Sequence, residues 1–389
     1  MNIIDLIKSL ISDTVIADFF KAGGWMRLAM IIIGGIFLWL AVKQNFEPYL
    51  LIPIAFGIIL VNLSPEIYIT YGENGEILSR GLLGFLHIGV ESELYPCLIF
   101  LGIGATTDFG PLIANKKTML LGAAAQIGIF AAFFGALLLG FDFFDAASIG
   151  IIGGADGPTA ILVSNSMANA SGDSSLLAGI ALAAYSYMAL VPVIFPPVIR
   201  LMTTKKERLI KMEQLRDVSK SEKILFPIVV TATVCLIVPS ATPLIGCLML
   251  GNLIKESGIV PNMVSACANA LLYICTILLG LSVGATAVGT TFLKWDTIKV
   301  FILGIAAFVT AAISGLLFGK LMCFFSKGKI NPMIGAAGVS AVPMAARVVQ
   351  REGQREDPSN FLLMHAMGPN VAGVIGSAIA AGILMAIFL

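Results

Sequence analysis

The sequence predicts an all-α polytopic membrane protein made of two inverted repeats, each with about five transmembrane helices and one broken re-entrant hairpin. Composition supports the membrane class, because 58% of the 389 residues are hydrophobic and only 12% are charged, about half the charged share of a soluble domain. Long apolar segments and a recurrence of short motifs support the helices and the repeats. The composition excludes a soluble enzyme, a nucleic-acid-binding protein and a disordered scaffold.

The apolar segments follow one another along almost the whole chain. Residues 1–24 come first and mix charged with apolar residues, which predicts an interfacial helix rather than a cleaved signal. A crossing needs about 20 apolar residues, and several of the segments are shorter. The segments are 25–42, 49–63, 93–107, 117–140, 146–168, 175–199, 222–239, 242–255, 264–287, 297–322, 330–349 and 360–388.

Two of these segments are predicted to be hairpins rather than simple crossings. Segment 330–349 contains Asn331-Pro332 and Pro343, and segment 146–168 contains the run Gly153-Gly154-Ala155-Asp156-Gly157-Pro158. Clustered glycine and proline interrupt a regular helix. We therefore expect each hairpin to enter and leave on the same side of the membrane.

The charges between segments predict the orientation. Residues 200–223 hold eight Lys or Arg against four acidic residues, so the linker 200–221 is predicted to be cytoplasmic by the positive-inside rule. Residues 64–93 hold five Glu and one Arg and are expected as an outer loop. This assignment predicts ten crossings and two hairpins, with both termini outside.

The two halves, 25–199 and 222–389, carry matching motifs in the same order. Pro53 and Asn62-Leu63 match Pro243 and Asn252-Leu253. The run Gly104-Ala105-Thr106 matches Gly284-Ala285-Thr286, and Ile152-Gly153 matches Ile334-Gly335. An odd number of crossings in each half inverts the second half, as in secondary transporters, whose sites lie at the midplane where broken helices meet. The two hairpin tips are therefore expected to face each other across a polar cavity.

Asp156 is the most informative residue, because a carboxylate within a span costs at least ~2.5–3.5 kcal/mol. Together with the hydroxyl of Thr159 and carbonyls exposed by the flanking glycines, it offers the oxygen ligands that a hard cation prefers. The alternative is a carboxylate that only caps a half-helix. We favour a cation or proton site, since a cap alone could be a serine.

Other polar residues stand in or beside the same segments, and each has a structural alternative. Asn331 is also typical of a turn, Ser340 of a hydroxyl bonded to its own helical turn, and Arg347 of a snorkelling side chain. Arg347 could instead bind an arriving carboxylate. Further candidates are Tyr185, Tyr187, His365 and Asn370, while Asn62 and Asn252 are predicted to join helices. For His365 a structural hydrogen bond is favoured over a proton relay.

The six cysteines stand singly in or beside apolar runs, without a CxxC pair or a histidine at metal-ligand spacing. They are interpreted as small core residues. No transition-metal site is expected.

Four stretches in order resemble one known family. They begin at Ile152 (IGGADGPTAI), Ala183 (AAYSYMALVP), Asn331 (NPMIGAAGVSAVPMAAR) and Met364 (MHAMGPNVAG). Together they are similar to the β subunits of the biotin-dependent Na+-translocating decarboxylases, a family that serves oxaloacetate, methylmalonyl-CoA, glutaconyl-CoA and malonate enzymes.

The resemblance implies a bacterial cytoplasmic-membrane subunit that decarboxylates carboxybiotin, consumes a proton and exports Na+. Na+ and biotin are the implied cofactors, with biotin on a partner carrier protein and not attached to this chain. The other implied partners are a carboxyltransferase subunit, a small single-span subunit and further copies of this chain; nucleic acid is not among them.

The resemblance also implies roles for individual residues. Asp156 would bind Na+ and couple it to catalysis, Tyr187 would take part in proton delivery, and Arg347 would be functionally important, which we interpret as a clamp for carboxybiotin. The implied Na+ ligands and path residues are Asp156, Asn331, Ser340 and Asn370, joined by Gly335 and Thr159, with Gly153, Gly154, Gly157, Pro158 and Tyr185 in support.

Two other functions remain open from the residues alone. A passive Na+-coupled carboxylate symporter would share the inverted repeats, the broken helices and the oxygen-rich midplane. A purely structural anchor for a decarboxylase complex would need no carboxylate in a broken segment. The motif set favours the decarboxylating pump over both.

Overall fold

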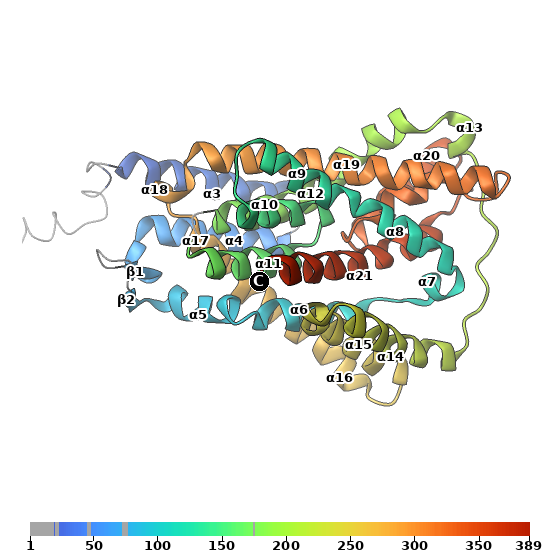
Figure 1. The fold of residues 1–389 in the computed structure, drawn as a ribbon, viewed down its shortest axis with the longest axis horizontal. Helices are drawn as coiled ribbons and strands as arrows, with labels where there is room; N and C mark the ends of the chain where they lie inside the picture. The colour runs from blue at the N-terminus through green and yellow to red at the C-terminus, as the bar shows by residue number, and fades with distance from the viewer. Residues whose placement is uncertain (1–18, 20–22, 45–47, 72–76, 174–175) are drawn as a thin grey trace, which may run out of the picture.

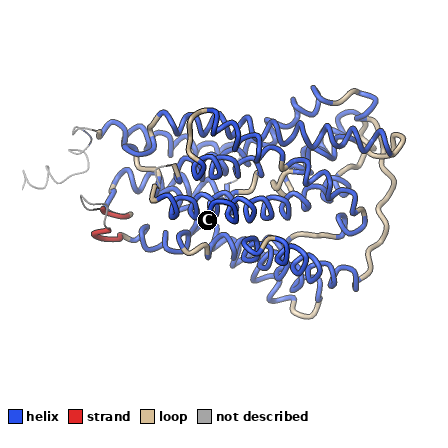
Figure 2. Tube along the Cα trace, viewed as in Figure 1, coloured by secondary structure: helices blue, strands red, loops and turns tan. Residues whose placement is uncertain are grey.

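The computed structural model describes residue 19 and residues 23–44, 48–71, 77–173 and 176–389. The interfacial helix predicted for residues 1–24 lies almost wholly outside the described residues. Helices account for nearly all of the described chain, and a two-stranded sheet lies at one end (Figure 2). The all-α membrane class predicted from composition is confirmed by these apolar helices.

The first half runs from the N-terminal helices through the first hairpin to a long proline-containing helix (Figure 1). Its elements are α3 (Gly24–Gln44), α4 (Pro48–Leu63), η1 (Pro65–Ile67), β1 (Ile69–Tyr71), β2 (Ile77–Arg80), α5 (Leu82–Glu91), α6 (Leu94–Thr106), α7 (Gly110–Ala114), η2 (Lys116–Thr118), α8 (Met119–Ala125), α9 (Ile127–Leu138), α10 (Phe143–Gly150), η3 (Ile151–Gly154), α11 (Gly157–Ser171) and α12 (Leu177–Met202).

The second half begins beyond the basic linker and ends in a buried helix. Its elements are α13 (Lys205–Arg208), α14 (Lys220–Ile237), η4 (Pro239–Ala241), α15 (Thr242–Ser257), α16 (Pro261–Ser265), the π-helical η5 (Ala266–Leu271), α17 (Leu272–Thr286), α18 (Gly289–Phe292), α19 (Trp295–Phe325), η6 (Pro332–Gly338), α20 (Met344–Glu356) and α21 (Leu363–Phe388).

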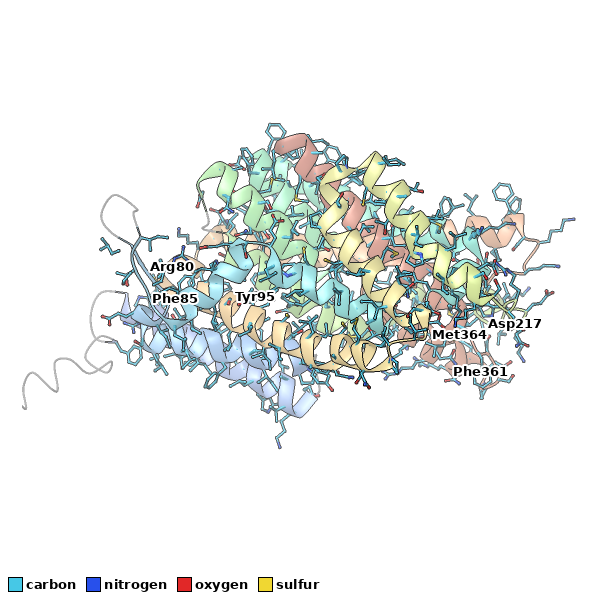
Figure 3. The ribbon with its side chains drawn as sticks, turned by 90° about the horizontal axis from the view of Figure 1, so that it is seen from below. Arg80, Phe85, Tyr95, Asp217, Phe361 and Met364 are labelled. Atoms are coloured by element: carbon cyan, nitrogen blue, oxygen red, sulfur yellow. The ribbon has the colours of Figure 1, made fainter. Side chains whose placement is uncertain are left out.

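Between α13 and α14, residues 209–219 form an extended segment without regular structure, which we call the strap. It crosses the end of the molecule opposite the β1–β2 hairpin (Figure 1). Figure 3 shows the same separation, with Arg80 at one end and Asp217 of the strap at the other. The acidic loop and the basic linker therefore lie at opposite ends, as the charge distribution predicted.

The segment 64–93 differs from the expected outer loop. It contains the antiparallel pair of strands β1 and β2 and the apolar helix α5, which meets α6 at a bend of 66°. Helix α5 has ten residues, including His87 and Glu91, and is too short to indicate a crossing by itself. It reaches crossing length only in combination with α6.

By length and apolarity, five of the described helices can cross a membrane, or seven if each bent pair is one span. Ten crossings were expected. The difference arises largely because α4 and α15 have only 16 residues each, although both coincide with predicted segments. The two segments predicted as hairpins are both broken, the first between η3 and α11 and the second between η6 and α20.

Two buried asparagines make matching contacts between the halves. Asn62 of α4 donates from Nδ2 to the carbonyl of Ala287 at 2.9 Å, and Asn252 of α15 donates from Nδ2 to the carbonyl of Thr107 at 3.3 Å. The motif alignment pairs Asn62 with Asn252, and it pairs the residue after Thr106 with the residue after Thr286. In an inverted repeat, each asparagine would bind the equivalent carbonyl of the other half, as these two do. The contacts therefore favour the inverted repeat, which stays a prediction.

Close backbone approach accompanies both asparagine contacts. A Cβ on Gly104 of α6 would stand 1.9 Å from the Leu248 carbonyl oxygen of α15, and one on Gly284 of α17 would stand 2.2 Å from the Ile54 carbonyl oxygen of α4. Within a membrane, helices associate through such small residues and through interhelical hydrogen bonds. These glycines fix the two helix pairs at a distance that no larger residue permits.

We predict that Asn62→Ala destabilises the chain more than Asn252→Ala. Asn62 also accepts from the backbone amide of Gly289 at 2.9 Å through Oδ1, so its loss leaves two buried backbone groups unpaired. Expected losses of unfolding free energy are about 2 kcal/mol for Asn62→Ala and under about 1 kcal/mol for Asn252→Ala. Thermal unfolding midpoints in detergent test this order, and a larger shift for Asn252→Ala would contradict it.

Candidate functional site

The two broken segments meet inside the protein. The backbone amide of Ser340, which follows η6, donates to the carbonyl of Gly154, at the end of η3, at 3.0 Å. The tips of the two segments therefore face each other as expected, while the assignment of each segment as a re-entrant hairpin stays a prediction. The tips touch directly at this point, where the sequence had suggested a cavity between them.

Asp156 lies where the tips meet and is 4% exposed. Its Oδ1 accepts from the backbone amide of Thr159 at 3.2 Å, so it caps the first turn of α11. Its Oδ2 accepts from the hydroxyl of Ser340 at 2.9 Å and from the hydroxyl of Ser377 at 2.8 Å. One carboxylate thus joins the first hairpin, the second hairpin and α21. We call Asp156, Ser340 and Ser377 the polar centre.

Ser377 was not among the predicted site residues. It lies in the run Gly376-Ser377-Ala378 of α21, where a serine resembles the small residues that pack helices. Its hydroxyl also lies 3.0 Å from the Val374 carbonyl oxygen. Because a hydroxyl has one proton, Ser377 can donate to Asp156 or to Val374, but not to both.

Asn370 fixes the backbone on both sides of Ser340. Its Nδ2 donates to the Val339 carbonyl at 2.6 Å and lies 3.4 Å from the Ala341 carbonyl. Its Oδ1 is buried and has no hydrogen-bond partner among the described residues. Asn370 therefore belongs to the neighbourhood of the polar centre and presents one uncommitted oxygen there.

Gln126, between α8 and α9, is a second residue that the sequence analysis missed. It is buried, its Nε2 donates to the Gly122 carbonyl at 3.1 Å, and its Oε1 has no partner in the described part of the chain. That oxygen lies 3.6 Å from where a Cβ on Gly154 would stand, beside Ser377. A glutamine alone among apolar residues of segment 117–140 was the available signal.

Glycines make room for the tips at several predicted positions. A Cβ on Gly153 would stand 2.5 Å from the backbone of Gly128 in α9, and one on Gly335 would stand 2.0 Å from the Gly315 carbonyl oxygen in α19. The approach at Gly154 is less close, since a Cβ there would stand 3.2 Å from the Ser377 Cβ, and Pro158 occupies the first turn of α11. Close packing against α9 and α19 thus explains why Gly153 and Gly335 have no room for a side chain.

The two tyrosines of α12 point to different neighbours. Tyr187 donates its hydroxyl to the Phe301 carbonyl of α19 and packs its ring against Phe308. Tyr185 packs against Gly157, where an added Cβ would stand 2.0 Å from its ring, and its buried hydroxyl has no partner among the described residues. The structure thus brings Tyr185, rather than Tyr187, next to the residue that follows Asp156.

Asn331 does not contact the polar centre. Its Nδ2 donates to the carbonyls of Ile210, at 2.8 Å, and Arg208, at 3.2 Å. Asn360 donates to the same two carbonyls. Asn331 and Asn360 therefore attach the beginning of the strap to the base of the second hairpin.

Ion pairs hold the strap and its neighbours to α20 and the segment that follows it. Arg208 pairs with Glu356 at 2.8 Å, and Lys211 pairs with Asp357 at 2.9 Å. Hydrogen bonds from Ser359, together with Lys211, lower the pKa of the Asp357 carboxyl to about 2. Because this pKa is depressed, the ion pair stabilises the folded protein fully at pH values above the ordinary pKa of the carboxyl. This stabilisation is lost only as the pH falls toward about 2.

Arg347 lies on the exposed face of α20, and its side chain forms no ion pair or hydrogen bond with any described residue. On a helix, residues four and three apart share a face. Arg347 therefore shares a face with Pro343, four residues before it, and with Gln350, three residues after it. The side-chain oxygen Oε1 of Gln350 accepts hydrogen bonds from the backbone amides of Leu362 and Leu363.

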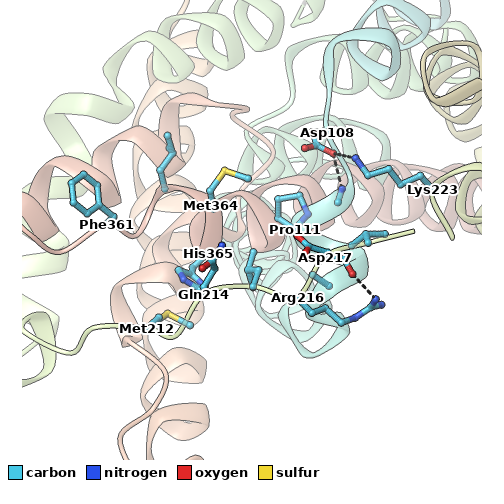
Figure 4. Close-up of a pocket in the computed structure, with 15 residues that line it drawn as sticks. Asp108, Pro111, Met212, Gln214, Arg216, Asp217, Lys223, Phe361, Met364 and His365 are labelled. Carbon is cyan, nitrogen blue, oxygen red and sulfur yellow. Dashed lines mark hydrogen bonds and ion pairs between the residues drawn. The ribbon is translucent and has the colours of Figure 1, made fainter. Parts of the chain in front are cut away.

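Two cavities lie between the strap and the polar centre and share one lining residue. The inner cavity, of about 390 Å³, is lined by Asp156, Ser340, Pro343 and Asp108 among others. The strap cleft, of about 920 Å³, lies between the strap, α7 and the beginning of α21 (Figure 4). Asp108 forms part of both walls, so the two cavities adjoin at this residue.

The candidate ligands at the polar centre are therefore one carboxylate, that of Asp156, and several neutral oxygens around it. Among the described residues, no three His, Cys, Asp or Glu side chains converge in a way that could hold a metal ion. A hard monovalent cation or a proton suits such a set better than a transition metal does.

Comparison with known proteins places the chain beside one group. The family described as the Na+-transporting oxaloacetate decarboxylase beta subunit matches residues 26–388. The methylmalonyl-CoA decarboxylase subunit beta of Veillonella parvula is 53% identical over 380 residues, which cover 98% of this chain and 97% of that protein. The glutaconyl-CoA decarboxylase subunit beta of Acidaminococcus fermentans is 53% identical over 367 residues, 94% of each.

A third relative carries a different substrate in its name. The oxaloacetate decarboxylase beta chain of Klebsiella pneumoniae is 47% identical over 410 aligned positions, which cover 92% of this chain and 94% of that protein.

We predict that Gly335→Ala disrupts the packing of the second hairpin on α19. The added methyl group would overlap the Gly315 carbonyl, and such overpacking costs about 1–3 kcal/mol or more. The matched control is Gly246→Ala in α15, where a Cβ would meet no atom within 4 Å. Gly335→Ala should lower the thermal unfolding midpoint in detergent, and Gly246→Ala should leave it equal or higher. Equal midpoints for the two variants would contradict the close packing.

Proposed function

The chain belongs to the Na+-transporting oxaloacetate decarboxylase beta subunit family, and we propose that its polar centre exchanges Na+ for the proton consumed when carboxybiotin loses CO2. The chain is a multi-pass bacterial membrane protein and a subunit of a Na+-translocating, biotin-dependent decarboxylase. The observation that carries the proposal is the buried Asp156 carboxylate with two serine hydroxyls on one of its oxygens.

Na+ binds between the carboxylate and the neutral oxygens around it. Ser340 and Ser377 supply hydroxyl oxygens, and Asn370 supplies an amide oxygen that is buried and uncommitted. Without the ion, both hydroxyl protons point toward Asp156. With Na+ bound, Ser377 turns its proton to the Val374 carbonyl and offers its lone pairs to the ion, so the backbone need not move.

Protonation of Asp156 releases the ion, because Na+ and the proton compete for the same carboxylate. Decarboxylation breaks the bond between the ureido nitrogen and the carboxyl carbon, and the bonding electron pair stays on the nitrogen. One proton adds to that nitrogen as CO2 leaves. Each turnover therefore removes a proton from the site, which restores the carboxylate for the next Na+.

The proton reaches the reaction through the tyrosine neighbourhood of α12. Tyr187 was expected in this role, and its hydroxyl is already bonded to the Phe301 carbonyl. Tyr185 packs against Gly157 and has a buried hydroxyl without a described partner. We assign proton transfer beside Asp156 to Tyr185, and to Tyr187 the positioning of α12 against α19.

Arg347 binds the carboxylate of the arriving carboxybiotin. Its guanidinium has no competing partner among the described residues, and bidentate Arg–carboxylate pairs are among the stronger polar contacts. Asn331 acts on the ion path indirectly, through the strap that it attaches to the hairpin. Thr159 fixes Asp156 through its backbone amide, and Gly335 acts through its packing on α19.

The family implies a carboxyltransferase and a biotin carrier as partners. Relatives that are about equally similar are named for methylmalonyl-CoA and glutaconyl-CoA, so we propose that the carboxyltransferase selects the substrate. A small single-span subunit and further copies of this chain complete the proposed assembly. Nothing in the names of these relatives favours the passive symporter.

We predict that Asp156→Asn abolishes Na+-stimulated release of CO2 from carboxybiotin. The amide has nearly the shape of the carboxylate but cannot ionise, so it loses both the charge that binds Na+ and the proton that is exchanged. CO2 release by the assembled complex, with and without Na+, measures the effect. Retained Na+ stimulation in a folded Asp156→Asn complex would refute the proposal.

We predict that Ser377→Ala raises the Na+ concentration for half-maximal activity about tenfold, or about 1.4 kcal/mol of binding free energy, because the variant loses the hydroxyl oxygen that binds the ion. The matched control is Ser282→Ala, which removes an equally buried serine whose hydroxyl bonds only its own turn of α17. That control should keep the wild-type Na+ dependence. If both variants shift it alike, the effect reflects general packing and Ser377 is not a ligand.

A further inference from the structure

The strap cleft combines an apolar wall with a few polar groups. Pro111, Met212, Leu363 and Met364 form apolar parts of its lining, and Gln214 stands among them. Its volume of about 920 Å³ is that of a typical small-molecule site. Such a lining suits a small ring that has one apolar face and polar edges.

His365 is the buried polar side chain in this wall. It is 8% exposed, and its Nδ1 has no hydrogen-bond partner among the described residues. In Figure 4 its ring lies beside Gln214 of the strap. A buried polar atom without a partner costs about 1–3 kcal/mol, and a ligand that offers a hydrogen bond would recover part of this free energy.

The charged residues of the cleft, Lys223 and Arg216 with Asp108 and Asp217, lie at the opposite end from Phe361 (Figure 4). Lys223 of α14 forms only long ion pairs there, at 3.6 Å to Asp108 and 3.9 Å to Glu256. An anionic ligand could therefore approach Lys223 without breaking a short, well-formed pair. Lys223 is thus the group in the cleft that can receive a ligand's carboxylate, in exchange for its long contact with Asp108.

The position of the cleft connects it to the chemistry. Asp108 belongs both to the cleft wall and to the inner cavity that reaches Asp156 and Ser340. The strap belongs to the basic linker 200–221, which places the cleft on the predicted cytoplasmic side, from which a soluble carrier protein arrives. A group bound in the cleft is therefore next to the route toward the polar centre.

We propose that the strap cleft is the seat of the carboxylated ureido ring of the carrier's biotin, with His365 as its buried hydrogen-bonding contact. This assignment rests on the proposed function and adds the binding site that receives the substrate. The ring's thioether face packs on the apolar wall, its ureido edge meets His365, and the carboxylate lies toward Lys223 before Arg347 engages it.

The test compares the two histidines of the chain. His87 in α5 is as buried as His365, and its Nδ1 likewise has no partner in the described residues, but it lies outside the cleft. In the complete complex, His365→Ala should raise the KM for the carboxylated carrier about tenfold, with the half-saturating Na+ concentration unchanged. His87→Ala should leave that KM unchanged, and His365→Asn should recover part of the loss. Equal KM values for all four proteins would overturn the assignment.

A binding measurement separates this inference from the proposed function. Gln214→Cys, on the strap, should react with a maleimide more slowly when biocytin is present, while Lys206→Cys, on α13 outside the cleft, should react at the same rate. Unchanged labelling of Gln214→Cys would overturn the assignment even if CO2 release depends on Na+. Protection by biocytin in a complex that lacks Na+-stimulated CO2 release would uphold the cleft and refute the proposed function.

Discussion

The buried carboxylate of Asp156 is the contact that holds three separate segments of this protein together. Asp156 must be paired inside the membrane, and its partners come from three places: the first turn of α11, the second hairpin through Ser340, and α21 through Ser377. None of these segments can move without leaving hydrogen-bonding groups unpaired in a medium where that is costly. The proposed ion site and the junction between the two broken segments are therefore one feature, and in this proposal occupation of the site acts directly on the contact between them.

Small residues let the hairpins reach that junction. Gly153 and Gly335 bring non-helical backbone against α9 and α19 at distances that exclude a side chain. Irregular backbone at this depth needs partners within the protein, and here the tips supply them to each other, since the amide of Ser340 bonds the carbonyl of Gly154. The contact between the two broken segments therefore pairs backbone groups that would otherwise lack partners. It also brings several oxygen atoms together at one point.

Much of this could be predicted from the sequence, because an Asp within a Gly-Pro break and a Pro-rich second segment are rare in apolar surroundings. Ser377 and Gln126 could not be assigned in the same way, since the role of each depends on which helix lies opposite, and a serine or glutamine in a span has several ordinary uses. Asn331 was expected near the ion for its polarity, yet its amide holds the strap. Helix α5 was missed because its ten residues, which include His87 and Glu91, reach crossing length only when joined to α6.

The strap contacts both the second broken segment and the cleft proposed to bind biotin. Its beginning is bonded to Asn331 and Asn360, and its later residues form one wall of the cleft. The second hairpin runs from Asn331 to Ser340 through the short η6, which is wholly buried. A ligand that displaces the strap therefore acts on the base of the segment whose tip holds Asp156. In the proposed function, substrate arrival and ion release are linked through this buried segment, without any need for the two ligands to touch.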